Sequence, residues 1–125
     1  MTAHRVLIVD DNEMNSAIAE VILRAEHFEV AMAADGRAAI EQVALFQPDL
    51  ILMDIQMPGM DGLEVTRILK ADPLTRHIRI AAFTAFAMQG DEAKMREAGC
   101  DAYLSKPIDV KRFGAQVRAC LVPSP

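Results

Sequence analysis

The sequence predicts an α/β domain in which five parallel strands alternate with five helices. Three observations predict this class. Short apolar runs with the length of buried strands recur along the chain, segments with helical spacing of apolar residues lie between them, and turn residues separate the two kinds of segment. Strands that alternate with helices build a parallel sheet, and right-handed crossovers place the helices on both of its faces, which gives a doubly wound sandwich of three layers.

The first predicted strand is 5–9, a short run of mostly apolar residues. Asp11 or Asn12 can cap the helix after it, because both side chains accept hydrogen bonds from free backbone amides. We expect that helix to bury one face whose members are spaced i, i+3, i+4 and i+7, namely Ile18, Val21, Ile22 and Ala25.

The second predicted strand, 28–32, alternates apolar and polar residues, with Phe28, Val30 and Met32 on one side. Alternation is typical of a strand that is less buried than a continuous apolar run. We therefore place this strand at an edge of the sheet.

Two further helices flank the most apolar strand, 50–53. The helix before it begins after a turn at 35–36 and ends at 47–48, and the helix after it ends at 72–73. Their expected inner residues are Ile40, Val43 and Ala44 in the first helix and Val65, Ile68 and Leu69 in the second. The continuous apolar run between the helices is typical of a strand buried on both faces.

The last third of the chain repeats the alternation. A strand at 79–83 precedes a helix near 90–98, which Gly99 is well placed to end, and a short strand at 102–104 precedes the final helix. The expected apolar faces are Met88, Met95 and Ala98 in the helix near 90–98, and Val110, Phe113, Val117 and Leu121 in the final helix.

The edge position of the second strand and the carboxylates after the first favour the strand order 2-1-3-4-5. This is the flavodoxin-like order, in which ligands bind where the first and third strands part.

We expect one domain, 1–125, without an output domain. A net charge of −5 argues against nucleic acids and anionic membranes as partners. Cys100 and Cys120 lack metal-type spacing, and we expect reduced, mostly buried thiols in a cytoplasmic protein.

Polar side chains follow four of the predicted strands at their carboxyl ends. Asp10 and Asp11 follow the first strand, Asp54 the third, Thr84 the fourth and Lys106 the fifth. Because the carboxyl ends of parallel strands meet at one edge of a sheet, we expect these groups to converge. Each of them alone has a plainer interpretation as a helix cap, a turn residue, a strand-end hydroxyl or an exposed lysine. Their joint occurrence favours a site.

Three converging carboxylates repel one another, and a hard divalent cation relieves the repulsion. Mg²⁺ is favoured, because it takes one or two carboxylates together with waters and phosphate oxygens. With Mg²⁺ and Lys106 present, the formal charge of the carboxylates is balanced and the site can receive an anionic phosphoryl group. Asp54, alone at the end of the central strand, is the expected nucleophile of an aspartyl phosphate, and Thr84 would hydrogen-bond the group.

These features give the chain a resemblance to the receiver domains of two-component response regulators over essentially its whole length. The segments that carry the resemblance are 9–12, 53–62, 84–85 and 103–108. More narrowly, the amino-acid sequence of segments 11–15 and 84–91 is similar to that of DivK-type single-domain regulators.

The resemblance implies a signalling protein, not an enzyme, in which Asp54 is the phosphoacceptor. The donor would be a sensor histidine kinase or a histidine phosphotransfer protein. Mg²⁺ would be held by Asp10 or Asp11, by Asp54 and by the backbone carbonyl of Gln56. In such domains Gln56 and Phe86 occupy positions that vary widely and tune self-catalysed dephosphorylation.

The resemblance also implies that Thr84 and Lys106 contact the phosphoryl group and that the bond before Pro107 is cis. On phosphorylation we expect Thr84 to move toward the new group and Tyr103 to turn inward. This movement would alter the surface made by the fourth helix, the fifth strand and the fifth helix. A downstream protein would bind that face, and the chain would be a monomer or a weak homodimer.

Other interpretations stay open. The chain can be a receiver excised from a hybrid histidine kinase, or a scaffold that is never phosphorylated. A phosphatase with an aspartate nucleophile usually has a second Asp two residues later, where this chain has Gln56. A flavodoxin-like cofactor binder needs a phosphate loop rich in Gly, Ser and Thr after the first strand, where this chain has the acidic segment 10–13.

Overall fold

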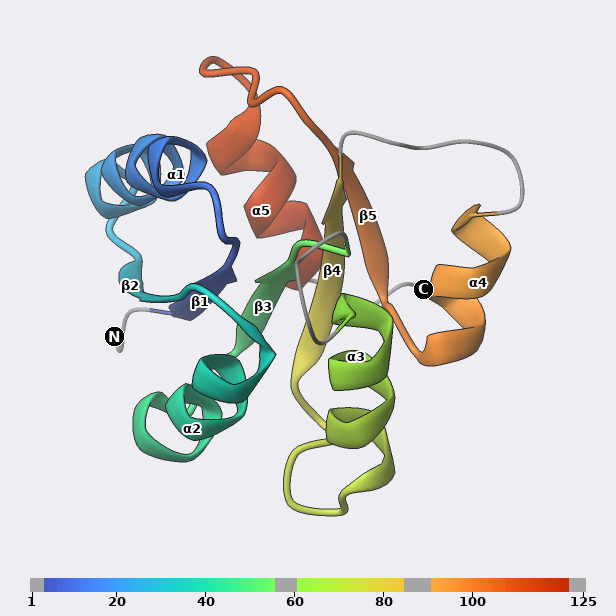
Figure 1. The fold of residues 1–125 in the computed structure, drawn as a ribbon. Coiled ribbons are helices and arrows are strands. Elements are labelled where there is room, and N and C mark those ends of the chain that lie inside the picture. Colours follow the sequence, from blue (N-terminus) through green and yellow to red (C-terminus); the bar gives the residue numbers. More distant parts are fainter. Residues whose placement is uncertain (1–3, 56–60, 85–90, 122–125) are drawn as a thin grey trace.

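Five parallel strands form one sheet in the order β2-β1-β3-β4-β5, as the sequence predicts (Figure 1). The computed structural model describes residues 4–55, 61–84 and 91–121. Along the chain the elements are β1 (Arg5–Val9), α1 (Glu13–Ala25), β2 (Glu29–Ala33), α2 (Gly36–Phe46), β3 (Leu50–Met53), α3 (Gly62–Ala71), β4 (Arg79–Thr84), α4 (Asp91–Ala98), β5 (Ala102–Ser105) and α5 (Phe113–Leu121).

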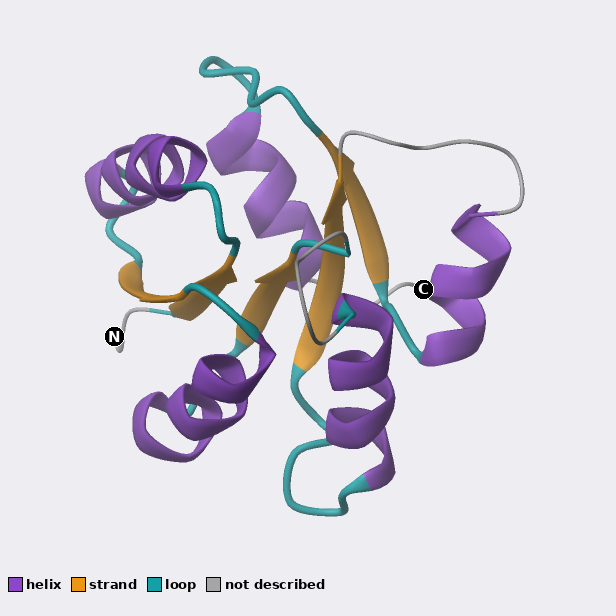
Figure 2. Cartoon of the chain, in the orientation of Figure 1, coloured by secondary structure: helices purple, strands orange, loops and turns teal. Residues whose placement is uncertain are grey.

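The helices cover the sheet on both faces and complete three layers (Figure 2). Alternate residues of the central strands point to opposite sides, so each face has its own apolar core. On one face Leu7 and Ile51 pack with residues of α2, α3 and α4. On the other face Ile8 and Leu52 pack with residues of α1 and α5. None of the described helices is long and apolar enough to cross a membrane.

The buried face of α1 differs from the expected one. Ser16, Ala19 and Leu23 are buried, whereas Ile18 is 39% exposed, Val21 is 68% exposed and Ala25 is also exposed. Of the expected face, Ile22 alone packs, partly buried, against the described core. Apolar residues occur nearly all round this helix, so periodicity alone did not decide which side is buried. Small residues face the sheet, because they let the helix backbone approach it closely.

Four other expected core residues also lie outside the core. Met32 in β2, Ile68 in α3 and Ala44 in α2 are exposed, and Val110 precedes α5 and is 67% exposed. Met95 and Ala98 are buried on α4 as predicted, and Gly99 follows that helix with a φ of 113°. Met88 lies outside the described residues. Among the described residues, the thin apolar face of α4 therefore consists of Met95 and Ala98.

Candidate functional site

The ends of β1 and β3 place two buried carboxylates side by side. Val9 and Met53 are paired in the sheet, and the Asp54 amide still donates to the Val9 carbonyl at 2.9 Å. Asp10 and Asp54 are therefore held by regular sheet geometry at the strand ends. Their exposed fractions are only 3% and 5%.

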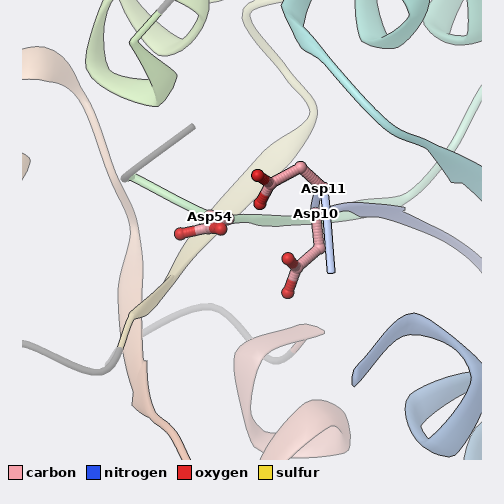
Figure 3. Close-up of side chains that lie close together, drawn as sticks. All are labelled: Asp10, Asp11 and Asp54. Carbon is pink, nitrogen blue, oxygen red and sulfur yellow. The ribbon is translucent and has the colours of Figure 1, made fainter. Parts of the chain in front are cut away.

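Asp11 brings a third carboxylate to the same place. One oxygen from each of Asp10, Asp11 and Asp54 lies within 4.8 Å of the other two, as Figure 3 shows for the three side chains. Asp11 is exposed, unlike the other two. The cluster is thus anchored in the sheet on one side and open to solvent on the other.

Lys106 supplies the positive charge predicted for this cluster. Its ammonium nitrogen lies 2.7 Å from Asp10 Oδ2 and 3.5 Å from Asp54 Oδ2, and its side chain is only 11% exposed. The Lys106 amide donates to the Thr84 carbonyl at 2.9 Å, which continues the pairing of β4 with β5. The peptide bond from Lys106 to Pro107 is cis, as expected.

The two oxygens of Asp10 are in different situations. Oδ1 accepts a hydrogen bond of 2.9 Å from the Asn12 amide. Oδ2 is fully buried and accepts no hydrogen bond from the described residues, although Lys106 lies within ion-pair distance. Lys106 is thus the ionic partner of this buried oxygen, whose capacity to accept a hydrogen bond is unused among the described residues.

A recess of about 260 Å³ joins these groups to Thr84, which is the last residue of β4 and is 5% exposed. Five of the predicted site residues therefore meet in one place. Asn12 and Asn15 also line the recess, and sequence reasoning did not assign them to it. Asn12 caps α1 by accepting from the Asn15 amide at 3.1 Å, so both belong to the first turn of that helix. Their spacing of three residues after a strand-end carboxylate is the signal that would have found them.

Two expected site residues, Gln56 and Phe86, lie outside the described residues. Nearby, Gly62 begins α3 directly against the Asp54 backbone, where a Cβ atom would collide with the Asp54 carbonyl oxygen. Glycine at this position lets α3 begin beside the recess.

Tyr103, the expected switch residue, lies on β5 opposite Ala82 of β4, two residues before Thr84, and does not line the recess. Its hydroxyl donates to the Glu92 carbonyl of α4 at 3.5 Å, and its ring packs partly buried against the core. A hydrogen bond with Tyr103 raises the pKa of Arg96, also on α4. The Tyr103 hydroxyl is thus engaged with α4 in this structure.

Comparison with known proteins decides the family. The profile of the response regulator receiver domain matches residues 6–118. The chain belongs to the response regulator receiver family. The polar-differentiation response regulator DivK of Brucella anthropi is 47% identical over 116 residues, which are 93% of this chain and 94% of that protein.

Solved structures of other receivers share the fold. The receiver domain of a signal transduction histidine kinase from Syntrophus aciditrophicus is 30% identical, with a TM-score of 0.85 over 95% of this chain and 90% of that one. A CheY-like receiver domain protein from Methanospirillum hungatei is 28% identical, with a TM-score of 0.85 over 96% of this chain and 94% of that one. Receivers are signalling modules, so the phosphatase and flavodoxin-like interpretations are not favoured.

Proposed function

We propose that this receiver accepts a phosphoryl group on Asp54 from a phosphohistidine protein and thereby changes its binding to a downstream protein. One observation carries the proposal. Asp54 lies at the end of the central strand in a recess that also contains a buried ammonium, a hydroxyl and two further carboxylates. A nucleophile surrounded by groups that neutralise and hold an anion is what phosphoryl transfer requires.

The transfer needs no separate general base, because the Asp54 carboxylate attacks as the anion. One carboxylate oxygen forms a bond to phosphorus while the bond from phosphorus to the donor imidazole nitrogen breaks. The electron pair of that bond stays on the imidazole, which leaves without its phosphoryl group. Lys106 and Thr84, which line the same recess, would hold the oxygens of the transferred group by charge and hydrogen bonding.

The residues of the recess fit a hard divalent cation. Three carboxylates with ligand oxygens within 4.8 Å of one another are an all-oxygen donor set, and buried Asp10 Oδ2 accepts no hydrogen bond from the part of the chain that the structure describes. We propose Mg²⁺, held by Asp54 and by Asp10 or Asp11, with the Gln56 carbonyl as a further ligand. When bound, this ion would neutralise the carboxylates and polarise the oxygens of the phosphoryl group.

The phosphodonor would dock on the outer side of α1. Met14, Ile18 and Val21 are exposed there at a spacing of four and three residues, and Asn15 between them lines the recess. A protein that presents a phosphohistidine to Asp54 must cover the rim of the recess, so its apolar surface would meet these side chains. We propose a sensor histidine kinase or a histidine phosphotransfer protein as this donor.

The downstream protein would bind the surface made by α4, β5 and α5. The Tyr103 hydroxyl contacts α4, and the thin apolar face of that helix makes it a weakly held element. Movement of Thr84 toward the phosphoryl group would free space for Tyr103 to turn inward, and α4 would then present a different surface. Converting such a switch from mostly off to mostly on takes about 5.5 kcal/mol of differential stabilisation.

We further propose that the chain acts as a single-domain regulator in the cytoplasm, as a monomer or weak homodimer. The likeness to DivK supports this, because the 47% identity extends over 93% of this chain and 94% of that protein. Two free, buried cysteines suit a reducing compartment.

The decisive experiment is intact mass after incubation with acetyl phosphate. Wild type should gain one phosphoryl group only when Mg²⁺ is present, and Asp54→Asn should gain none. Asp109→Asn, which changes an exposed carboxylate outside the recess, is the matched control and should react like wild type. Decay of the adduct then measures self-catalysed dephosphorylation. An adduct that persists in Asp54→Asn, or none in wild type, would refute the proposal.

A further inference from the structure

A second hollow lies between α2 and α3, which run along the same face of the sheet (Figure 1). It is a groove of about 730 Å³, bordered by the two helices, by the turn 47–49 and by the segment 72–78. Its floor contains Val43, Leu69 and Ile78, which are at most 4% exposed and belong to the core on that face. The groove thus opens directly onto apolar side chains.

Large apolar side chains also stand exposed at its rim. Ile68 of α3 is 46% exposed, and Leu74, which follows that helix, is 81% exposed. Neither contributes to the described core, so the fold does not account for them. Exposed apolar residues that gather round a hollow mark a binding surface.

The charged side chains that line the groove are carboxylates. Asp49 and Asp72 line it, and its described lining contains no lysine or arginine. One oxygen of each carboxylate is held by a backbone amide, from Arg5 to Asp49 and from Leu74 to Asp72. The second oxygen of each accepts no hydrogen bond from the described residues. Asp49 Oδ2 also lies 3.7 Å from Nδ1 of His4. Both carboxylates are therefore held by backbone amides and keep one oxygen each that can receive a cation.

This groove is separate from the phosphoacceptor recess. Asp49 directly precedes β3 and Asp54 directly follows it, so the two sites lie at opposite ends of the same strand. Five steps along an extended chain span about 16 Å. A ligand in the groove would not touch Asp54.

We propose that the α2–α3 groove binds a helix of a partner protein that presents apolar side chains next to lysine or arginine. Its volume falls within the roughly 300–1,000 Å³ that binding pockets occupy, which suits the few anchoring side chains of one helix. A second copy of this chain suits it poorly, because the chain carries a net charge of −5 and an isologous contact would bring Asp49 and Asp72 of both copies together. Docking here is independent of phosphorylation and would tether the regulator in either state.

A phage-displayed library of helical peptides, about 18 residues long, tests the proposal against the immobilised full chain. Enriched peptides should carry apolar residues spaced i, i+3 or i+4, and i+7, with lysine or arginine beside them. Their affinity should fall about tenfold for Leu74→Lys and for Ile68→Lys. It should fall less for Asp72→Asn, which removes only the charge attraction.

Leu45→Lys is the matched control, because Leu45 is equally exposed on α2, at 80%, and does not line the groove. It should keep wild-type affinity, as should wild type loaded with beryllofluoride and Mg²⁺, which mimic the phosphoryl group, and circular dichroism should show all variants folded. The proposal is wrong if no peptide is enriched, if the rim variants bind as tightly as wild type, or if Leu45→Lys loses as much. A loss of affinity when wild type is loaded with beryllofluoride and Mg²⁺ would overturn the independence of docking from phosphorylation. All of these outcomes leave the acetyl phosphate result unaffected.

Discussion

The ammonium of Lys106 lies 2.7 Å from Asp10 Oδ2 and forms a buried ion pair with it. The Asp10 side chain has no exposed surface, and that of Lys106 is 11% exposed. The Lys106 ammonium therefore lies closer to Asp10 than to Asp54, whose Oδ2 is 3.5 Å away. A cation that took over Asp10 would release Lys106 to hold the phosphoryl group on Asp54.

Replacing Lys106 with methionine should destabilise the protein by about 3 kcal/mol, because it leaves a buried carboxylate without a countercharge. Mg²⁺ should restore more stability to Lys106→Met than to wild type. Urea denaturation followed by circular dichroism, with and without Mg²⁺, measures both effects. Adding Asp10→Asn should recover most of the loss, whereas a double variant as unstable as Lys106→Met would contradict the ion-pair explanation.

Tyr103 offers a direct optical test of the switch, because it is the only tyrosine and the chain has no tryptophan. Beryllofluoride with Mg²⁺ mimics the phosphoryl group, and it should make tyrosine fluorescence less accessible to acrylamide as the ring turns inward. Thr84→Ala should bind the mimic without this change, because the hydroxyl that couples the two sites is gone. Equal protection in wild type and Thr84→Ala would show that Thr84 does not transmit the signal.

Lys70 should matter for stability far more than an exposed lysine does. Its ammonium donates to Asp101 Oδ2 and to the Ile78 carbonyl, both at 2.8 Å, and thereby joins α3 to the segment before β4 and to the turn before β5. Lys70→Met should cost about 2 kcal/mol, because it leaves the partly buried Ile78 carbonyl without this donor and removes the countercharge of Asp101, whose Oδ2 keeps, among the described residues, only the hydrogen bond from the Ile80 amide. Thermal or urea unfolding would show this loss.

The matched control is Arg112→Met. Arg112 pairs with Asp109 at 3.8 Å, and the two side chains are 79% and 52% exposed. Exposed pairs of this kind contribute at most about 1 kcal/mol. A loss in Arg112→Met as large as that in Lys70→Met would mean that partial burial does not strengthen the Lys70 interactions.

Stability should fall in alkali partly through Cys100. Burial raises the pKa of this thiol from 9.0 to about 11. Above about pH 9 the unfolded chain loses a proton that the folded chain keeps, so the free energy of unfolding decreases until about pH 11. The full effect is about 2 to 3 kcal/mol. Urea unfolding at several pH values should show a shallower decline for Cys100→Ala, and an unchanged decline would exclude this thiol as the cause.

Strand order and the convergence of Asp10, Asp11, Asp54, Thr84 and Lys106 could be read from the sequence. The reason is geometric. Buried parallel strands are continuous apolar runs, and the residue that ends each run is carried to the same edge of the sheet. A short-range pattern thus determined a long-range arrangement.

Tertiary structure alone decided which side of α1 is buried. Ile18 and Val21 are the more hydrophobic choice, yet the smaller Ser16 and Ala19 face the sheet. Apolar residues at helical spacing show that a helix face can be buried. Which of several such faces is buried depends on how closely the helix packs against the sheet. The same selection left Ile68 at the rim of the α2–α3 groove.

The pairing of Lys106 with Asp10, at 2.7 Å, likewise needed the folded chain. The sequence predicts that the Lys106 ammonium meets three carboxylates, but it does not predict which of the three lies nearest to it. Distance and burial rank them, because an ion pair is governed by the few ångströms between two atoms and by the water excluded around them. The sequence by itself determined which chemical groups meet in this receiver, and only the tertiary structure decided which of them touch.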